Sequence, residues 1–194
     1  MLGRQAKTLN TAQVKAVLLH LTNTRNPVRN KLIFLLSAKA GLRAKEIAGL
    51  TWRMVTDSQG HIAREINLED KASKGRSGGV IAINSELSEA LIDWRKKCWV
   101  IDSHTRVICT ERSKTTSAQV IVNMFWDWYL ALGFQGCSSH SGRRTFITNA
   151  ARKISLVGGS LRDVQALARH SSLSMTQRYI DTDVEAQRKV VELI

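Results

Sequence analysis

The chain has little of what builds disulfide scaffolds, flexible linkers or membrane spans. It contains one proline, Pro27, and three cysteines in 194 residues. An odd number of cysteines without a Cys-x-x-Cys pair does not suit a disulfide framework or a zinc site, and it predicts buried thiols in a reducing compartment. No apolar run reaches the roughly 20 residues that cross a bilayer, and the N-terminus has no apolar signal core. We therefore expect a cytoplasmic protein that does not act in a membrane.

Acidic residues are also scarce. The chain has 16 Asp and Glu residues and 29 Lys and Arg residues, which gives a formal net charge of +13. Between residues 135 and 180, seven basic residues accompany a single acid, Asp163. Such an excess predicts a polyanionic partner, most simply nucleic acid, although a basic ribosome- or membrane-associated domain also fits the charge. Metal-dependent transposases need clustered carboxylates, which the basic segments lack, so we expect no metal and no other cofactor.

Caps and apolar periodicity predict a mostly helical chain. Asn10 and Gln13 have the spacing of a capping box before an apolar helix face, while Pro27 begins a second helix that Gly41 ends. By the same signals, further helices are predicted over 43–50, 85–98, 117–133, 140–154, 161–168, 174–179 and 184–193.

One polar, glycine-rich stretch predicts a β-hairpin. The sequence KASKGRSGG separates residues 61–67 from residues 79–84, and both flanks alternate or carry β-branched side chains. The short sequence RVICT predicts a further strand. We therefore expect a mainly α fold with a small antiparallel β-sheet (α+β), in a single domain over residues 1–194.

A late tyrosine accompanies histidines and arginines. Tyr179 follows His170 by nine residues, and His140 precedes Arg143 by three. Metal-free cleavage of a phosphodiester needs a nucleophile, cations for two phosphate oxygens and a proton for the leaving oxygen. Tyrosine, arginine and histidine or lysine supply these groups. Taken singly, each residue has an ordinary alternative, such as a packing tyrosine or a helix-end histidine.

In order and spacing, these residues resemble the catalytic domain of the tyrosine recombinases, the phage integrase family. The first arginine of that family lies in a Gly-Leu-Arg-x-x-Glu segment, which Arg43 and Glu46 match. Its His-x-x-Arg pair is matched by His140 and Arg143. Each segment is a weak signal alone, but the ordered set is specific.

The remaining catalytic positions of the family are matched as well. Its later histidine, followed nine residues on by the tyrosine, is matched by His170 and Tyr179. Its lysine lies in a β-hairpin, where Lys74 is a better match than Lys71 because of its distance from the returning strand at 80–83. The resemblance covers residues from about 9 to 180.

The resemblance implies a role for each matched residue. Tyr179 would attack the scissile phosphate to give a 3′-phosphotyrosyl link and a free 5′-hydroxyl. Arg43 and Arg143 would bind the non-bridging oxygens. Lys74 would be the general acid, and His140 would move a proton or orient the tyrosine.

Further residues are expected to support catalysis or to contact DNA. His170 would hydrogen-bond the phosphate, and Glu46 would support Arg43 from three residues along the same helix face. The residues expected to contact DNA are Arg144, Arg169, Arg178, Lys71 and Arg76. We expect double-stranded DNA with specific recombination sites as the partner, and a synaptic tetramer on that DNA.

The chain departs from the family's pattern in places. The family commonly has Leu-Gly-His before the tyrosine, whereas Arg169 stands here in place of the glycine, and Gly142 stands where many members carry leucine. The N-terminal core-binding domain of most members is not expected, so the chain is either a catalytic fragment or a short member of the family. For the terminal helix, about 184–194, we favour exchange between protomers over folding back on its own domain.

Other functions remain open from the sequence. A DNA-binding regulator without catalysis could use the same scaffold and charge. An enzyme like the type IB topoisomerases would share the chemistry but relax supercoils without a second site. The complete set of catalytic residue types favours the site-specific recombinase.

Overall fold

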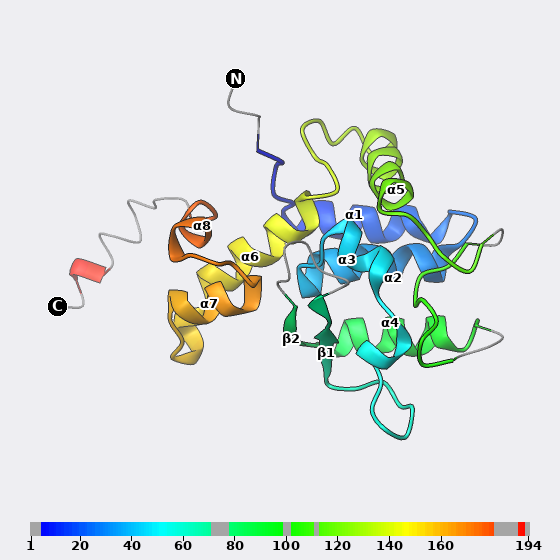
Figure 1. Cartoon of the computed structure of the whole chain (residues 1–194). Helices are drawn as coiled ribbons and strands as arrows, with labels where there is room; N and C mark the ends of the chain where they lie inside the picture. The colour runs from blue at the N-terminus through cyan, green and yellow to red at the C-terminus, as the bar shows by residue number, and fades with distance from the viewer. Residues whose placement is uncertain (1–4, 71–77, 99–101, 111–112, 181–189, 193–194) are drawn as a thin grey trace.

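The computed structural model describes residues 5–70, 78–98, 102–110, 113–180 and 190–192. Lys71, Lys74, Arg76 and most of the predicted terminal helix lie outside these residues. The described fold is mainly helical with a two-stranded antiparallel sheet, so the predicted fold class is confirmed (Figure 1). None of its helices has both the length and the apolar character needed to cross a bilayer.

The first two helices begin where the sequence predicts, and the second also ends at the predicted residue. Helix α1, Thr11–Thr22, starts with the capping box: Asn10 Oδ1 accepts from the Gln13 amide at 2.8 Å, and Gln13 Oε1 accepts from the Asn10 amide. Helix α2, Pro27–Ala40, ends at Gly41, whose φ of 64° is left-handed. Glycine adopts this conformation without steric cost, which explains the stop.

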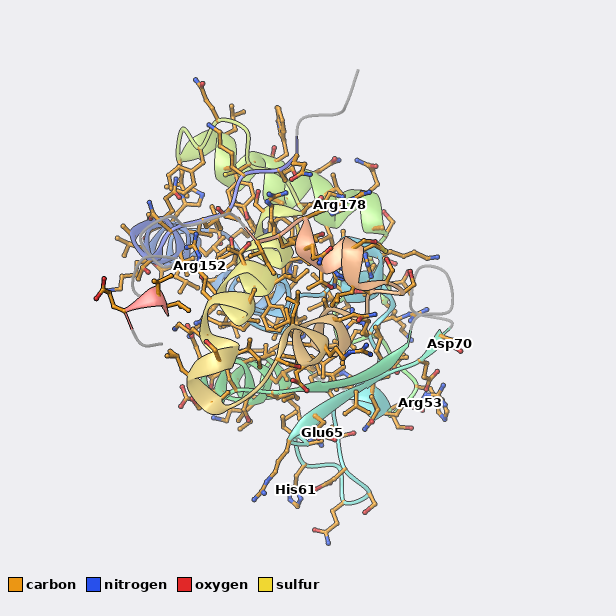
Figure 2. The ribbon with its side chains drawn as sticks, turned by 90° about the vertical axis from the view of Figure 1, so that its left-hand side faces the viewer. Arg53, His61, Glu65, Asp70, Arg152 and Arg178 are labelled. Atoms are coloured by element: carbon orange, nitrogen blue, oxygen red, sulfur yellow. The ribbon has the colours of Figure 1, made fainter. Side chains whose placement is uncertain are left out.

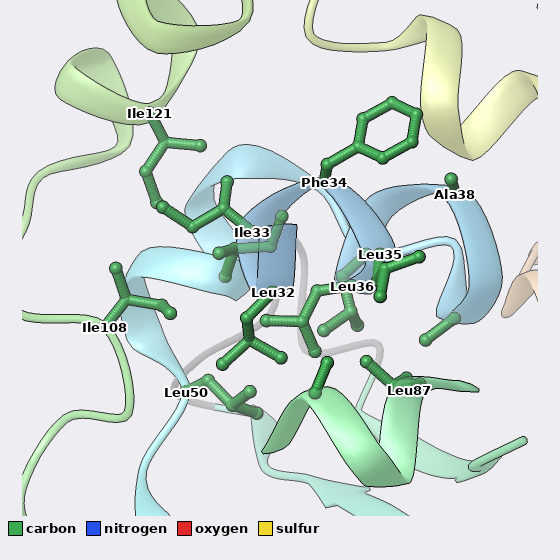
Figure 3. Close-up of a cluster of buried hydrophobic side chains, with 14 of the residues drawn as sticks. Leu32, Ile33, Phe34, Leu35, Leu36, Ala38, Leu50, Leu87, Ile108 and Ile121 are labelled. Carbon is green, nitrogen blue, oxygen red and sulfur yellow. The ribbon is translucent and has the colours of Figure 1, made fainter. Parts of the chain in front are cut away.

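Helix α2 forms the centre of the main core. Its residues 32–36 are all apolar and fully buried (Figure 3), so this stretch of the helix is enclosed on every side rather than on one face. Leu50, Leu87, Ile108 and Ile121 approach it from separate segments of the chain (Figure 3). A helix so enclosed provides a rigid base for the segments that follow it.

The middle of the chain adds short elements around α2. Helix α3 is Ala44–Gly49, and a 3₁₀ turn η1 is Trp52–Met54. Strands β1, Glu65–Leu68, and β2, Gly79–Ala82, pair from Glu65 with Ala82 to Leu68 with Gly79. Helices α4, Ser85–Arg95, and α5, Ala118–Ala131, complete this part.

The predicted strand over RVICT is wrong. In this segment Arg106 and Thr110 form only isolated bridges, and no strand of the described sheet lies beside it. Val107 and Ile108 are nevertheless fully buried, and the Val107 amide and carbonyl bond to the Leu50 carbonyl and the Trp94 indole. Burial in the core therefore explains the β-branched residues here without a sheet.

The last helices lie together at one side of the molecule (Figure 1). They are α6, Ser141–Lys153, η3, Ile154–Val157, α7, Leu161–Ala168, and α8, Leu173–Gln177. Helix α6 packs on α2, and α7 packs on α6. A second, smaller apolar cluster of Ile147, Val164 and Ala168 holds α6 and α7 together.

Candidate active site

Arg43 lies at the start of α3, immediately after the left-handed turn at Gly41. Its backbone amide and its Nη1 donate to the two carboxylate oxygens of Glu46, each at 2.8 Å. Glu46 is fully buried, whereas the Arg43 side chain is 21% exposed. The buried carboxylate thus fixes a guanidinium that keeps one side open to solvent.

Arg143, in the first turn of α6, is the most enclosed cation of the site. Its Nη1 donates to the Gly41 carbonyl and its Nη2 to the Ala168 carbonyl, so it joins the end of α2 to the end of α7. Burial, with a smaller contribution from Arg43, lowers the pKa of Arg143 to about 10. The group therefore remains a cation at neutral pH.

His170 follows the end of α7 and is buried. Its Nδ1 lies 3.0 Å from Thr176 Oγ1, and its ring stacks on Tyr179 with 5.3 Å between ring centroids. Burial and the positive charges of Arg143, Arg43 and Arg169 lower its pKa to about 4. The imidazole is therefore neutral at pH 7.

Tyr179 follows α8 and is half-buried against the smaller apolar cluster. Thr148 of α6 donates to its carbonyl at 3.1 Å, which ties this backbone to the helix that carries Arg143. The Arg144 guanidinium lies 5.5 Å from the centre of its ring. Tyr179 is also near enough to Arg143 to influence that residue's pKa.

The other predicted residues are placed differently. His140 is exposed and precedes α6, where its carbonyl accepts from the Arg144 amide. Arg144 also donates to Gln5 Oε1. Arg178, at the end of α8, is exposed (Figure 2), as expected of a DNA contact.

Arg169 points inward. Its side chain is 5% exposed, and its Nη2 donates to Glu46 Oε2 at 2.8 Å. It is the only described residue other than glycine with a positive φ, 51°. Glu46 therefore lies between two guanidinium groups that come from distant parts of the chain.

Sequence reasoning did not single out the groups that orient these side chains. Thr176 contacts His170, Thr148 holds the Tyr179 backbone, and the carbonyls of Gly41 and Ala168 accept from Arg143. Threonines and backbone carbonyls have no spacing pattern that marks them in one sequence. Thr176 is close to Tyr179 in the sequence, but its contact with His170 is seen only in the structure.

The arrangement suits an anionic phosphate. Arg43, Arg143, His170 and Tyr179 come from separate segments and gather where α2, α6 and α7 meet. Cations and hydrogen-bond donors fixed before the substrate arrives stabilise developing negative charge most effectively. A tyrosine hydroxyl beside them can serve as a nucleophile.

Comparisons with known proteins agree with this geometry. The model of the phage integrase family matches residues 7–186. The chain is 24% identical over 188 residues to the tyrosine recombinase XerC of Histophilus somni, an alignment that covers 96% of this chain and 60% of that relative. It is 27% identical over 162 residues to XerC of Brucella suis, of which it covers 48%. The chain thus spans about half to three fifths of these relatives' length.

A similar fold occurs in solved structures. The crystal structure of XerA recombinase matches with a TM-score of 0.74 at 22% identity, covering 96% of this chain and 65% of that one. A structure of the Tn1549 transposon integrase in complex with a circular intermediate DNA matches with a TM-score of 0.73 at 19% identity, covering 98% and 66%. At these identities the likeness shows the fold.

Proposed function

The chain belongs to the phage integrase family, and we propose that it is a site-specific DNA recombinase that cleaves and rejoins DNA through a 3′-phosphotyrosyl intermediate. The observation that carries the proposal is the meeting of Arg43, Arg143, His170 and Tyr179 at one place in the fold. The fold and the local excess of basic residues support the same function.

The proposed reaction is a transesterification. Tyr179 Oη bonds to the scissile phosphorus while the bond from phosphorus to the 5′-oxygen breaks. The departing 5′-oxygen takes a proton, which we assign to Lys74, and the phenol proton passes to His140 or to water. In the reverse step a 5′-hydroxyl attacks the phosphotyrosine, and the phenol leaves. One phosphodiester is exchanged for another ester, so no co-reactant is needed.

Arg143 can hold its structural bonds and still bind the phosphate. Each terminal guanidinium nitrogen carries two N–H groups and Nε carries one. The bonds to the Gly41 and Ala168 carbonyls use one N–H on each terminal nitrogen. The remaining donors, together with those of Arg43, suit the two non-bridging oxygens.

His170 acts in its neutral form. A neutral imidazole has one N–H, so it donates from only one ring nitrogen. If the Thr176 hydroxyl donates to Nδ1, the proton lies on Nε2, which then donates to a phosphate oxygen. With this direction of the bond, Thr176 would select the tautomer that the proposed role requires.

Double-stranded DNA is the proposed partner, recognised at specific sites by several copies of the chain in a synaptic tetramer. Arg144 and Arg178 would contact the backbone around the scissile phosphate, and we propose Lys71 and Arg76 as further DNA contacts. We place this activity in the cytoplasm, and we propose that the segment about 184–194 packs on a neighbouring protomer.

A covalent trapping experiment tests the proposal. A pool of nicked duplexes with randomised sequence loses a short strand after cleavage, so any phosphotyrosyl complex persists in denaturant. Sequencing the trapped DNA identifies the site, which is then made as a single nicked duplex. We expect the wild-type chain to form the complex and Tyr179→Phe to form none.

The other tyrosine supplies a matched control. Tyr129 is one of only two tyrosines, it is 2% exposed, and its hydroxyl has no partner among the described residues. Tyr129→Phe should therefore form the complex at the wild-type rate. A complex with Tyr179→Phe would disprove the assignment of the nucleophile. Binding of the pool without any complex would favour the regulator, and relaxation of a plasmid without exchange between sites would favour the topoisomerase.

A further inference from the structure

Arg169 occupies a backbone conformation that disfavours it. Its φ of 51° and ψ of 47° form the left-handed turn that ends α7 and lets the His170 amide bond the Gln165 carbonyl. A residue with a Cβ is disfavoured in this conformation, which is why glycine is common there. An arginine at this position needs a compensating interaction.

The interactions that compensate for this conformation lie inside the fold. The Arg169 side chain is 5% exposed, its Nη2 bonds Glu46, and its Nε and Nη1 are buried without a hydrogen-bond partner among the described residues. Its Cδ lies against Gly79 at the start of β2, where an added Cβ would approach to 3.3 Å. The guanidinium is thus enclosed between α3, α7 and β2, and its bonded nitrogen, Nη2, is directed to Glu46.

Glu46 shows what this enclosed cation does. The carboxylate is fully buried and accepts from the Arg43 amide, from Arg43 Nη1 and from Arg169 Nη2. Without Arg169, the charges of Arg43 and Glu46 would cancel. With Arg169, the three groups carry one net positive charge, and the most exposed of them is Arg43, which is 21% exposed.

We propose that Arg169 is a positioning residue for DNA cleavage, which neutralises Glu46 and holds it in place so that Arg43 keeps its orientation and its charge for the scissile phosphate. The inference rests on the proposed recombinase function and goes beyond it, because it assigns Arg169 an action through Glu46 and Arg43 rather than a contact with DNA. Burial lowers the pKa of Arg169, which is consistent with a desolvated cation held by Glu46.

Single-turnover cleavage of the nicked duplex recovered from the pool tests this. Arg169→Gly restores the residue best suited to the left-handed turn and removes the charge. We expect its cleavage rate at saturating DNA to fall about tenfold or more, with little change in the DNA concentration for half-saturation. Arg169→Lys keeps the charge and should recover part of the rate. Circular dichroism and the thermal midpoint establish that each variant is folded at the assay temperature.

A double-mutant cycle separates positioning from general damage. Glu46→Gln removes the group through which Arg169 acts, so Arg169→Gly should cost much less in that background than in the wild type. Arg162→Ala is the matched control, because Arg162 is an exposed cation on the same helix. Its rate should stay within about twofold of wild type, as for ordinary surface substitutions.

The outcomes distinguish the two proposals. If the wild-type chain forms no covalent complex with any DNA of the pool, the proposed function fails and this inference fails with it. If the wild type reacts and Arg169→Gly is as fast as Arg162→Ala, only the role of Arg169 is overturned. The role of Arg169 would also be overturned if Arg169→Gly changed only the DNA concentration for half-saturation. The same holds if Arg169→Gly lowered the cleavage rate equally in the wild type and in the Glu46→Gln background.

Discussion

At the scale of single residues, the candidate site is a group of charges that the fold has taken out of water. Glu46 is fully buried and Arg143 is 3% exposed. An unpaired buried charge costs several kcal/mol, so each such group needs partners. Glu46 has two guanidinium groups, and Arg143 has two carbonyls. These bonds orient the cations before any phosphate binds.

His170 makes the stability of the chain depend on pH. Its folded-state pKa of about 4 is below the ordinary 6.5, so between these values the unfolded chain binds a proton that the folded chain does not. Stability from this residue is therefore complete above pH 6.5 and decreases as the pH falls toward 4. We expect the urea midpoint to fall between pH 7 and pH 5, and to fall less in His170→Gln.

Comparing the two proteins at each pH removes the contribution of carboxylates, which titrate in both. His61 supplies the control, because its side chain is 74% exposed. His61→Gln should show the wild-type dependence on pH. An identical decrease in wild type and His170→Gln would contradict a buried, neutral His170.

The matched residues could be predicted from the sequence because their order and spacing resemble the catalytic pattern of the phage integrase family. Arg43, Arg143, His170 and Tyr179 were predicted together and do lie close to one another. The inward direction of Arg169 could not be predicted, since it depends on a left-handed turn and on Glu46, 123 residues away. Its assignment as a DNA contact used only its charge.

At the scale of elements, the site depends on how closely α6 approaches α2. A Cβ at Gly142 would come within 2.5 Å of Ser37 Oγ and 2.9 Å of Ser37 Cβ. The absence of a side chain at Gly142 thus sets the distance between the helix that carries Arg143 and the helix that ends at Gly41.

Gly142→Ala should therefore destabilise the chain. Alanine is favoured over glycine in a helix by about 1 kcal/mol, but overpacking costs about 1–3 kcal/mol, and the clash with Ser37 should prevail. We expect a lower free energy of unfolding in urea. Adding Ser37→Gly should recover part of the loss, since it removes both atoms nearest to the new methyl group.

Asn149→Ala provides the comparison on the same helix. Asn149 is exposed, so its replacement should change the free energy of unfolding by no more than about 0.5 kcal/mol. If Gly142→Ala were as stable as this control, the space between α6 and α2 would be large enough to accept a methyl group, and the predicted clash with Ser37 would be absent. If the losses in free energy of unfolding from Gly142→Ala and Ser37→Gly simply added in the double variant, a direct contact between the two positions would be excluded.

Local signals predicted the helices better than the strands. The capping box of Asn10 with Gln13 begins α1 as predicted, and a capping box of Ser160 with Asp163 begins α7 at the start of the predicted helix over 161–168, because a cap is satisfied within one turn. A strand needs a partner elsewhere in the chain. The segment RVICT has β-branched residues but no such partner among the described strands, so its side chains fill the core without forming a sheet.

At the scale of the whole molecule, the chain has two apolar clusters of unequal size. The main cluster surrounds α2 and draws residues from α1 to α5. The smaller one has three buried residues, Ile147, Val164 and Ala168, with Tyr179 packed against it. Tyr179, the proposed nucleophile, therefore lies in the part of the molecule that buries less apolar surface. Hydrogen bonds from Arg143 to the Gly41 carbonyl and from Arg169 to Glu46 connect this part to the main core.

The difference in size between the two apolar clusters predicts that the part around the small cluster opens separately from the main core. Opening of α7 and α8 exposes little apolar surface, so it should need less free energy than opening of α2. In hydrogen exchange followed by mass spectrometry, we expect peptides of α7 and α8 to exchange well before those of α2. Equal protection of α8 and α2 would instead mean that the small cluster and the main core unfold as one unit.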